Sequence, residues 1–151
     1  RWIVGNVLDI DIPASTIDGI IAIEMTEYLG NKNLKTLATR ARDWLSADGI
    51  FIIISGSIAD DEKNYTKSAK LFNNFYKTKL SKTKEYRALG ELPHLRLLKE
   101  IDLKKEMITY WNLRATNKIF WNSPQGIIEK LIAKALMSGL ADYKAYVFQK
   151  K

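Results

Sequence analysis

Two apolar runs without polar alternation, Ile20 to Ile23 and Gly49 to Ile54, most constrain what this chain can fold into. Strands of this kind are covered on both faces, as in parallel sheets. Between the runs, apolar residues recur at helical spacing, and they are Leu34, Leu37, Ala38, Ala41, Trp44 and Leu45. Residues 18–54 are therefore predicted to form a β-α-β unit, with Gly49 as the stop signal of its helix.

The first residues are predicted to be a third strand of the same kind. Residues 2–4 are apolar, and the turn pair Gly5-Asn6 follows them at once. Arg1 stands where an initiator Met would be, so the chain opens inside a buried strand. We expect a fragment of an α/β sheet, with unpaired backbone groups and a tendency to aggregate at residues 2–4.

The second half gives weaker signals. Asp60-Asp61 is predicted to cap a helix carrying Leu71, Phe72, Phe75 and Tyr76. Further along, the sequence predicts a short helix at 95–99, a strand at 106–111, a helix at 126–140 and a closing strand with period-2 alternation at 143–148. The length of 151 residues indicates one domain, 1–151, with 1–57 as its core, 59–93 as an insertion or substrate cap, and 94–151 as the C-terminal strands and helix.

Composition indicates a globular chain in a cytoplasmic setting. Hydrophobic residues make up 46% and charged residues 27%, and no apolar run approaches the eighteen or so residues of a spanning helix. The chain has no cysteine and one histidine, His94, which excludes disulfides, thiolate zinc sites and a multi-histidine metal site within it. A net charge of +7 would steer anionic partners toward it.

The stretch from Gly5 to Pro13, the run from Ile17 to Leu29 and the turn Leu45-Ser46-Ala47-Asp48-Gly49 carry a family resemblance. They resemble class I S-adenosylmethionine-dependent methyltransferases, and the most specific part is Glu-Met-x-Glu-aromatic-Leu at 24–29. The resemblance is strong over 1–57 and implies a partial Rossmann-like α/β sheet, mostly parallel with an antiparallel C-terminal strand and with helices on both faces. Residues 2–4, 18–23 and 49–54 would be the third to fifth family strands, and the two predicted C-terminal strands the sixth and seventh. The first two strands and the glycine-rich cofactor loop would be missing.

The resemblance also implies a cofactor site for S-adenosyl-L-methionine. Asn6 would hydrogen-bond the adenine amino group, with Val7 and Leu8 beside the ring. Ile23, Glu24 and Met25, at the end of the next strand, would line the methionine end and face the substrate. Alternatively, Gly5-Asn6 is only a tight turn, and Glu24 and Glu27 form a solvated helical face.

Catalytic residues are not marked by any motif, because methyl transfer from an activated donor needs mainly orientation and a dry pocket. Glu27, Tyr28 and His94 are weak candidates for a proton acceptor. Tyr28 stands where some relatives have the His of a metal-holding Glu-x-x-Glu-His pattern, so we predict no metal. Asp18 is expected to be structural. An acceptor pocket could be lined by Tyr65, Phe72, Phe75, Tyr76 and Trp111, although such aromatic residues are more often core.

We therefore predict methyl transfer to a small-molecule, lipid-linked or glycan acceptor by the full-length protein, with this fragment inactive. The alternative is a basic α/β module that binds nucleic acid or an anionic surface, for which the run Lys77 to Arg87 supplies five cations. The amphipathic stretch 126–140 could lie on a membrane surface, but a helix packed on the sheet is favoured. A third possibility is a subunit completed by another chain.

Overall fold

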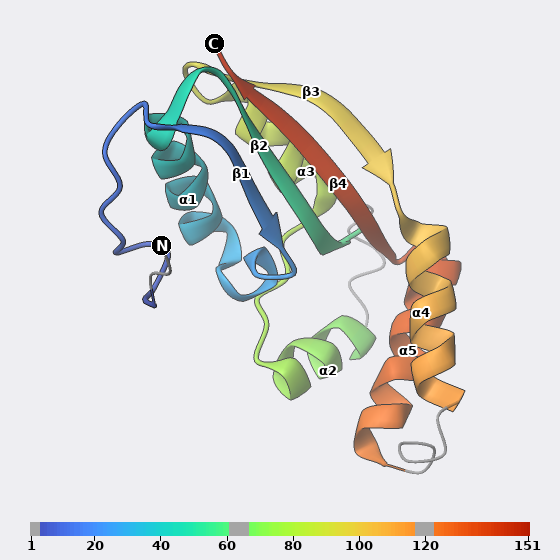
Figure 1. Ribbon diagram of the computed structural model, residues 1–151. Coiled ribbons are helices and arrows are strands. Elements are labelled where there is room, and N and C mark those ends of the chain that lie inside the picture. Colours follow the sequence, from blue (N-terminus) through green and yellow to red (C-terminus); the bar gives the residue numbers. More distant parts are fainter. Residues whose placement is uncertain (1–3, 61–66, 117–122) are drawn as a thin grey trace.

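The computed structural model describes residues 4–60, 67–116 and 123–151 (Figure 1). The predictions for residues 2 and 3, for Asp61 as a helix cap and for Tyr65 as a pocket residue lie outside these residues. Four strands form one sheet in the order β1-β2-β4-β3. Their bounds are β1 Ile17–Ile23, β2 Leu45–Ile58, β3 Leu95–Asp102 and β4 Ala141–Lys150.

The described sheet has one parallel and two antiparallel pairings, so the prediction of a mostly parallel sheet holds for strand direction and not for pairing. β1 pairs with β2 in parallel, and β4 is antiparallel to both of its neighbours, β2 and β3. It follows that β1, β2 and β3 run in one direction and that the C-terminal strand β4 runs in the other. The carboxyl ends of β1, β2 and β3 consequently meet at one end of the sheet, where β4 begins.

The predicted β-α-β unit is confirmed. Helix α1, Gly30–Trp44, connects β1 to β2, and its apolar stripe is fully buried. Leu34 and Leu37 belong to the same core cluster as Phe51 and Ile53 of β2. Burying a side chain of this size stabilises the fold by about 1.5–3 kcal/mol, so this stripe alone accounts for the docking of α1 on the sheet.

Gly49, predicted to be the stop signal of the helix, has a different role in the structure. Asp48, and not Gly49, takes the left-handed conformation, with φ of 62°. Gly49 is needed for a close approach instead, because a Cβ there would lie 2.9 Å from the carbonyl oxygen of Ser46. The strand is already paired at Leu45, which lies opposite Ile17 of β1.

Two elements of the second half were predicted wrongly. Residues 95–99, predicted as a helix, belong to strand β3, and residues 106–111, predicted as a strand, belong to helix α4, Lys104–Thr116. In β3 the pairing register shifts between Leu97 and Lys99. This bulge places two leucines in succession and hides the period-2 signal. The first of the two C-terminal strands therefore lies at Leu95–Asp102 and not at 106–111.

The remaining helices lie around the sheet and beyond its end. Thr26–Tyr28 forms the short 3-10 turn η1, and α2 spans Lys67–Tyr76. Helix α3, Thr83–Arg87, and the 3-10 turn η3, Ala88–Glu91, follow. Helix α5, Pro124–Met137, confirms the helix predicted at 126–140. Among the described residues, no helix has the length and hydrophobicity needed to cross a membrane.

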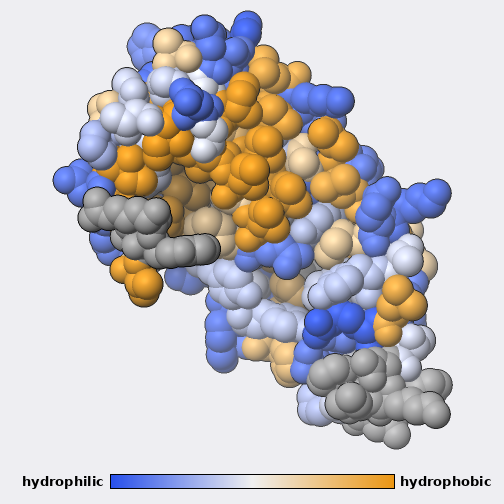
Figure 2. Space-filling model, viewed as in Figure 1, coloured by the Kyte–Doolittle hydropathy of each residue, from blue (hydrophilic) through white to orange (hydrophobic). Residues whose placement is uncertain are grey.

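One face of the sheet carries the core, and the other is largely uncovered. Leu37 of α1, Tyr86 of α3 and Leu89 of η3 all join the core cluster on the first face. On the opposite face, Ile21, Ile23 and Leu98 are exposed to 63%, 59% and 47%. Figure 2 shows apolar residues gathered over the strands on this side. The predicted cover of helices on both faces is thus present on one face of the described structure.

Candidate functional site

A cavity of about 300 Å³ lies at the end of the sheet where β1 and β2 finish and β4 begins. Its floor is formed by the strand ends, and its walls come from α2, α4 and α5, which extend beyond the sheet in Figure 1. The walls are aromatic and aliphatic. They include Phe72, Tyr76, Tyr110, Trp111, Ile128, Leu131, Ile132, Ala135 and Leu136. A cavity with apolar walls and a few polar groups is typical of small-molecule sites.

Glu24 marks the floor of the cavity at the end of β1. Its φ of 48° is unusual for a residue with a side chain, and conformations of this kind gather at functional sites. The backbone N–H of Glu24 donates to the carbonyl of Ile54 (2.9 Å), so its position is fixed by β2. The hydroxyl of Tyr143, from β4, donates to Glu24 Oε1 (2.8 Å). Burial, together with this carboxylate, raises the pKa of Tyr143 far above its usual value.

Glu27, in turn η1, places a second carboxylate beside the first. Its side chain is only 7% exposed. Oε1 accepts a hydrogen bond from the backbone N–H of Gly56 (2.8 Å), whereas the buried Oε2 has no hydrogen-bond partner. Burial is the main reason that the pKa of Glu27 is raised, despite the hydrogen bonds that oppose it. Such a carboxyl group can exchange protons closer to neutral pH than a solvated one.

An ion pair closes the far wall. Arg114 of α4 donates from Nε (3.0 Å) and from one terminal nitrogen (2.8 Å) to Oε1 of Glu129 on α5. Glu129 is fully buried, and the guanidinium also lies over the rings of Tyr110 and Trp111. The pair fixes α4 against α5 and so holds the cavity open between them and α2.

The residues predicted for the adenine end of the cofactor, Asn6, Val7 and Leu8, lie outside the cavity. The side chain of Asn6 closes a local turn, because its amide nitrogen donates to Asp9 (2.9 Å) and its oxygen accepts from the N–H of Leu8 (3.1 Å). Val7 and Leu8 are half-buried against the core cluster. None of these three lines the cavity. The amide of Asn6 would have to leave this turn before it could bind an adenine.

The other predicted residues fall at both ends of the sheet. Glu24, Glu27 and Tyr28 line the cavity, whereas Ile23 is exposed on the uncovered face and Met25 packs against the core. His94 lies at the opposite end, where its carbonyl accepts from the N–H of Lys151 (3.0 Å).

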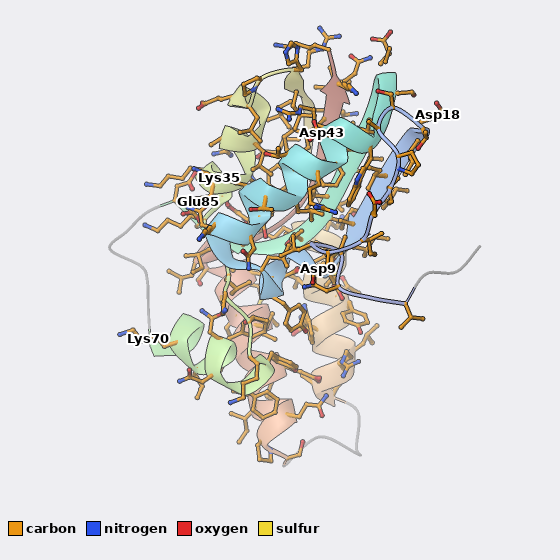
Figure 3. The ribbon with its side chains drawn as sticks, turned by 90° about the vertical axis from the view of Figure 1, so that its left-hand side faces the viewer. Asp9, Asp18, Lys35, Asp43, Lys70 and Glu85 are labelled. Atoms are coloured by element: carbon orange, nitrogen blue, oxygen red, sulfur yellow. The ribbon has the colours of Figure 1, made fainter. Side chains whose placement is uncertain are left out.

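Asp18 occupies the same opposite end, at the start of β1, far from α2, α4 and α5 (Figure 3). It accepts a hydrogen bond from Ser46 Oγ (2.7 Å) and so ties the start of β1 to the start of β2. This contact supports the structural role expected for Asp18.

The aromatic residues proposed for an acceptor pocket separate into two groups. Phe72, Tyr76 and Trp111 line the cavity, and Phe75 does not. Sequence reasoning missed Tyr110 and Arg114, which lie on the wrongly predicted α4, and Tyr143, the third residue of strand β4. The antiparallel register that sets Tyr143 opposite Gly56 is the signal that could have found it.

The structure also shows the surroundings of the basic run at 77–87 and of the amphipathic stretch at 126–140. In the basic run, Arg87 forms ion pairs with Glu100 (2.7 Å) and Asp60 (2.9 Å), which offset part of its positive charge. Helix α5 packs against α4 and lines the cavity with its apolar face, instead of lying on the sheet. Its exposed apolar residues include Ile127 and Met137.

The residues at the end of β1 suit one part of the expected cofactor. Glu24 offers a carboxylate and Ile23 an exposed apolar side chain, which fit the ammonium group and an apolar portion of S-adenosylmethionine. The turn at Asn6 offers no such fit in its present arrangement. The described residues would thus contribute to the methionine end more than to the adenine end.

Comparison with known proteins identifies the fold. No family model and no curated protein matches the sequence. Among solved structures, geranyl diphosphate C-methyltransferase from Streptomyces coelicolor A3(2) matches with a TM-score of 0.87 and 20% identity, over 100% of this chain and 54% of that chain. The cyclopropane synthase MmaA2 from Mycobacterium tuberculosis matches with a TM-score of 0.79 and 14% identity, over 99% of this chain and 60% of that one. A putative sarcosine dimethylglycine methyltransferase from Galdieria sulphuraria matches with a TM-score of 0.78 and 13% identity, over 97% of this chain and 58% of that one.

These matches cover the whole sheet and the helices beyond it. The chain spans a little over half the length of the methyltransferases that it resembles. It has the fold of the class I S-adenosylmethionine-dependent methyltransferases.

Proposed function

We propose that this chain is the acceptor-binding part of an S-adenosylmethionine-dependent methyltransferase that acts on a small, largely apolar molecule. The observation that carries the proposal is the cavity at the carboxyl ends of β1 and β2, the place where open α/β sheets bind ligands. Solved structures with the same fold were crystallised with S-adenosylmethionine or S-adenosylhomocysteine. When bound, the cofactor would supply the activated methyl group.

The roles of the residues follow from their positions. Glu24, with Ile23 and Met25, would hold the methionine end of the cofactor. The aromatic and aliphatic walls from α2, α4 and α5 would hold the acceptor and exclude water, which is most of what methyl transfer requires. The apolar character of these walls favours a small or lipid-like acceptor over a glycan. Asn6, Val7 and Leu8 remain proposals for the adenine end.

The activity is proposed for a protein that contains this chain. This chain covers 54% and 60% of two of the methyltransferases that it matches, so the 151 residues alone are predicted to bind weakly and to be inactive. The basic-module alternative gains no specific observation, because the cations at 77–87 include ion-paired Arg87.

Calorimetric titration with S-adenosylhomocysteine tests the proposal. Glu24→Gln should weaken binding about tenfold, as expected when a charge-assisted hydrogen bond becomes a neutral one. Glu91→Gln, at the far end of the sheet, is the matched control and should have no effect. Equal affinities for both variants and the parent chain would remove Glu24 from the site, and absence of binding to the parent chain would count against the cofactor proposal for these residues.

A further inference from the structure

Among the described residues, Glu27 and Glu129 each have a buried carboxylate oxygen with no hydrogen-bond partner, and Glu27 is the one of the two that lines the cavity. A carboxylate oxygen that is buried without a hydrogen bond is costly, and such an oxygen calls for an explanation such as a catalytic role or a bound water, ion or ligand that completes it. Oε2 of Glu27 is in this situation, while Oε1 is held by Gly56 and the hydroxyl of Ser55 lies close enough to the carboxyl group to lower its pKa. The backbone of Glu27 is also fixed, because its carbonyl accepts from the N–H of Lys79 (2.6 Å).

The other charged side chains that line the cavity already have partners. Glu24 accepts from Tyr143, and Arg114 pairs with Glu129. Asp142 pairs with Lys104 (2.8 Å) and accepts from Thr83 (2.8 Å). Among the described residues that line the cavity, the buried groups without a hydrogen-bond partner are therefore Oε2 of Glu27 and the hydroxyl of Tyr76, and Glu27 is the charged one.

The rest of the cavity is lined mainly by apolar side chains and suits an apolar ligand. Helix α5 contributes Ile128, Leu131, Ile132 and Leu136, and aromatic rings face them from α2 and α4. If each heavy atom takes roughly 30 Å³, the volume of a water molecule in the liquid, about 300 Å³ holds on the order of ten heavy atoms. This is the size of an eight-carbon chain with a head group.

We propose that the cavity selects its ligand by the head group: an apolar body of about ten heavy atoms that ends in a hydrogen-bond donor, a hydroxyl or an ammonium group, bound by Glu27. Anionic heads are rejected, because Glu24 and Glu27 both face them at the floor. The term acceptor for this ligand rests on the proposed function, but the head-group preference does not. A donor held there would stand beside a carboxyl group whose raised pKa suits it to accept a proton.

The test compares three ligands of matched size, 1-octanol, octylamine and octanoate, by calorimetry on the 151-residue chain without cofactor. We expect at least one of the two donors to bind about tenfold more tightly than octanoate, a ratio in the range that a like-charge contact produces. Tighter binding of octylamine assigns an ammonium head, and tighter binding of octanol assigns a hydroxyl. If octanoate binds as tightly as both donors, the proposal is overturned.

Two variants locate the effect. Glu27→Gln should reduce the preference of the donors over octanoate to about twofold or less, since the charge that rejects the anion is halved. Glu91→Gln should leave that preference unchanged. Ala135→Phe should fill the cavity and weaken all three ligands together, and it keeps the test valid if Glu27→Gln does not fold. Binding that survives Ala135→Phe would place the ligands elsewhere and overturn the proposal.

Failure of the cofactor proposal gives a different pattern. If S-adenosylhomocysteine does not bind but the head-group preference disappears with Glu27→Gln, the cavity inference stands and the methyltransferase proposal fails. If the cofactor analogue binds at Glu24 while the three ligands do not differ, the reverse holds.

Discussion

At the scale of single residues, the interior around the site is joined by hydroxyl groups as well as by apolar contacts. Tyr86 is fully buried, and its hydroxyl lies 2.9 Å from Ser55 Oγ and 3.2 Å from Thr26 Oγ1. Burial raises the pKa of Tyr86 to about 12, so this hydroxyl is protonated at neutral pH. These bonds tie α3 to the last residues of β2 and to turn η1, next to Glu27 in the sequence.

Replacing Tyr86 by Phe should therefore lower the free energy of unfolding by about 1 kcal/mol, the usual net worth of a buried hydrogen bond. Urea denaturation measures the change. Tyr28→Phe is the matched control, because Tyr28 is 51% exposed, and it should change stability very little. Equal effects of the two substitutions would show that the hydroxyl network contributes nothing.

At the scale of elements, a network of ion pairs joins α3, β3 and β4. Arg87 donates twice to Glu100, at 2.7 and 2.9 Å, and Lys144 donates to the same carboxylate. These partners, with Arg87 the larger cause, hold the pKa of Glu100 down at about 2. A lowered pKa stabilises the folded state above the ordinary carboxyl pKa of 4.5, and the contribution is lost as the pH falls from there toward 2.

Glu100→Gln should remove this acid-sensitive contribution, which we put at about 2 kcal/mol after allowing for partial exposure. The difference in unfolding free energy between pH 7 and pH 3 should shrink by that amount. The exposed Glu106 of α4 provides the control, since Glu106→Gln should leave the difference close to that of the parent chain. An unchanged difference in Glu100→Gln would contradict the pairing.

The ion pair between Arg114 of α4 and Glu129 of α5 differs from the pair between Arg87 and Glu100, because Glu129 is fully buried. Arg114→Leu leaves that carboxylate without its charge partner and should destabilise the fold by about 3 kcal/mol. The double variant Arg114→Leu, Glu129→Leu should recover part of the loss, since no charge remains buried. A double-mutant cycle by urea denaturation checks this, and strictly additive losses would mean that the two residues do not interact.

The same elements show what the sequence could and could not predict. The β-α-β unit was predictable, because its buried strands and one-sided helix carry strong periodic signals. The stretch 106–111 was wrongly predicted to be a strand, because its β-branched and aromatic residues favour that conformation. Packing against α5 overrides that preference, and Asp102 Oδ1, which accepts from the N–H of Lys104 (2.8 Å), starts a helix there. The site was predictable only where it follows β1, since the rest depends on how α2, α4 and α5 meet.

At the scale of the whole molecule, the largest anomaly is the uncovered sheet face of Figure 2. Ile21, Ile23 and Leu98 are exposed there, on strands whose composition is that of a buried sheet. Contiguous apolar patches of this kind favour association with other surfaces. The 151-residue chain is therefore expected to self-associate through this face.

Sedimentation velocity should show oligomers of the parent chain at micromolar concentrations and a shift toward monomer in the Ile21→Thr, Ile23→Thr double variant. Leu113→Thr removes an isolated exposed leucine on α4, 67% exposed, and should leave the distribution unchanged. If the double variant associates as strongly as the parent chain, the face is not the surface responsible.

We propose that this chain carries the acceptor side of a methyltransferase site at the carboxyl ends of its parallel strands. A crystal structure of the chain soaked with S-adenosylhomocysteine and octylamine tests it most directly. The account predicts the homocysteine portion beside Ile23, Glu24 and Met25, and the alkyl chain between α2, α4 and α5 with its nitrogen at Glu27. Ligands bound at the His94 end of the sheet, or an empty cavity at saturating concentrations of both, would contradict it.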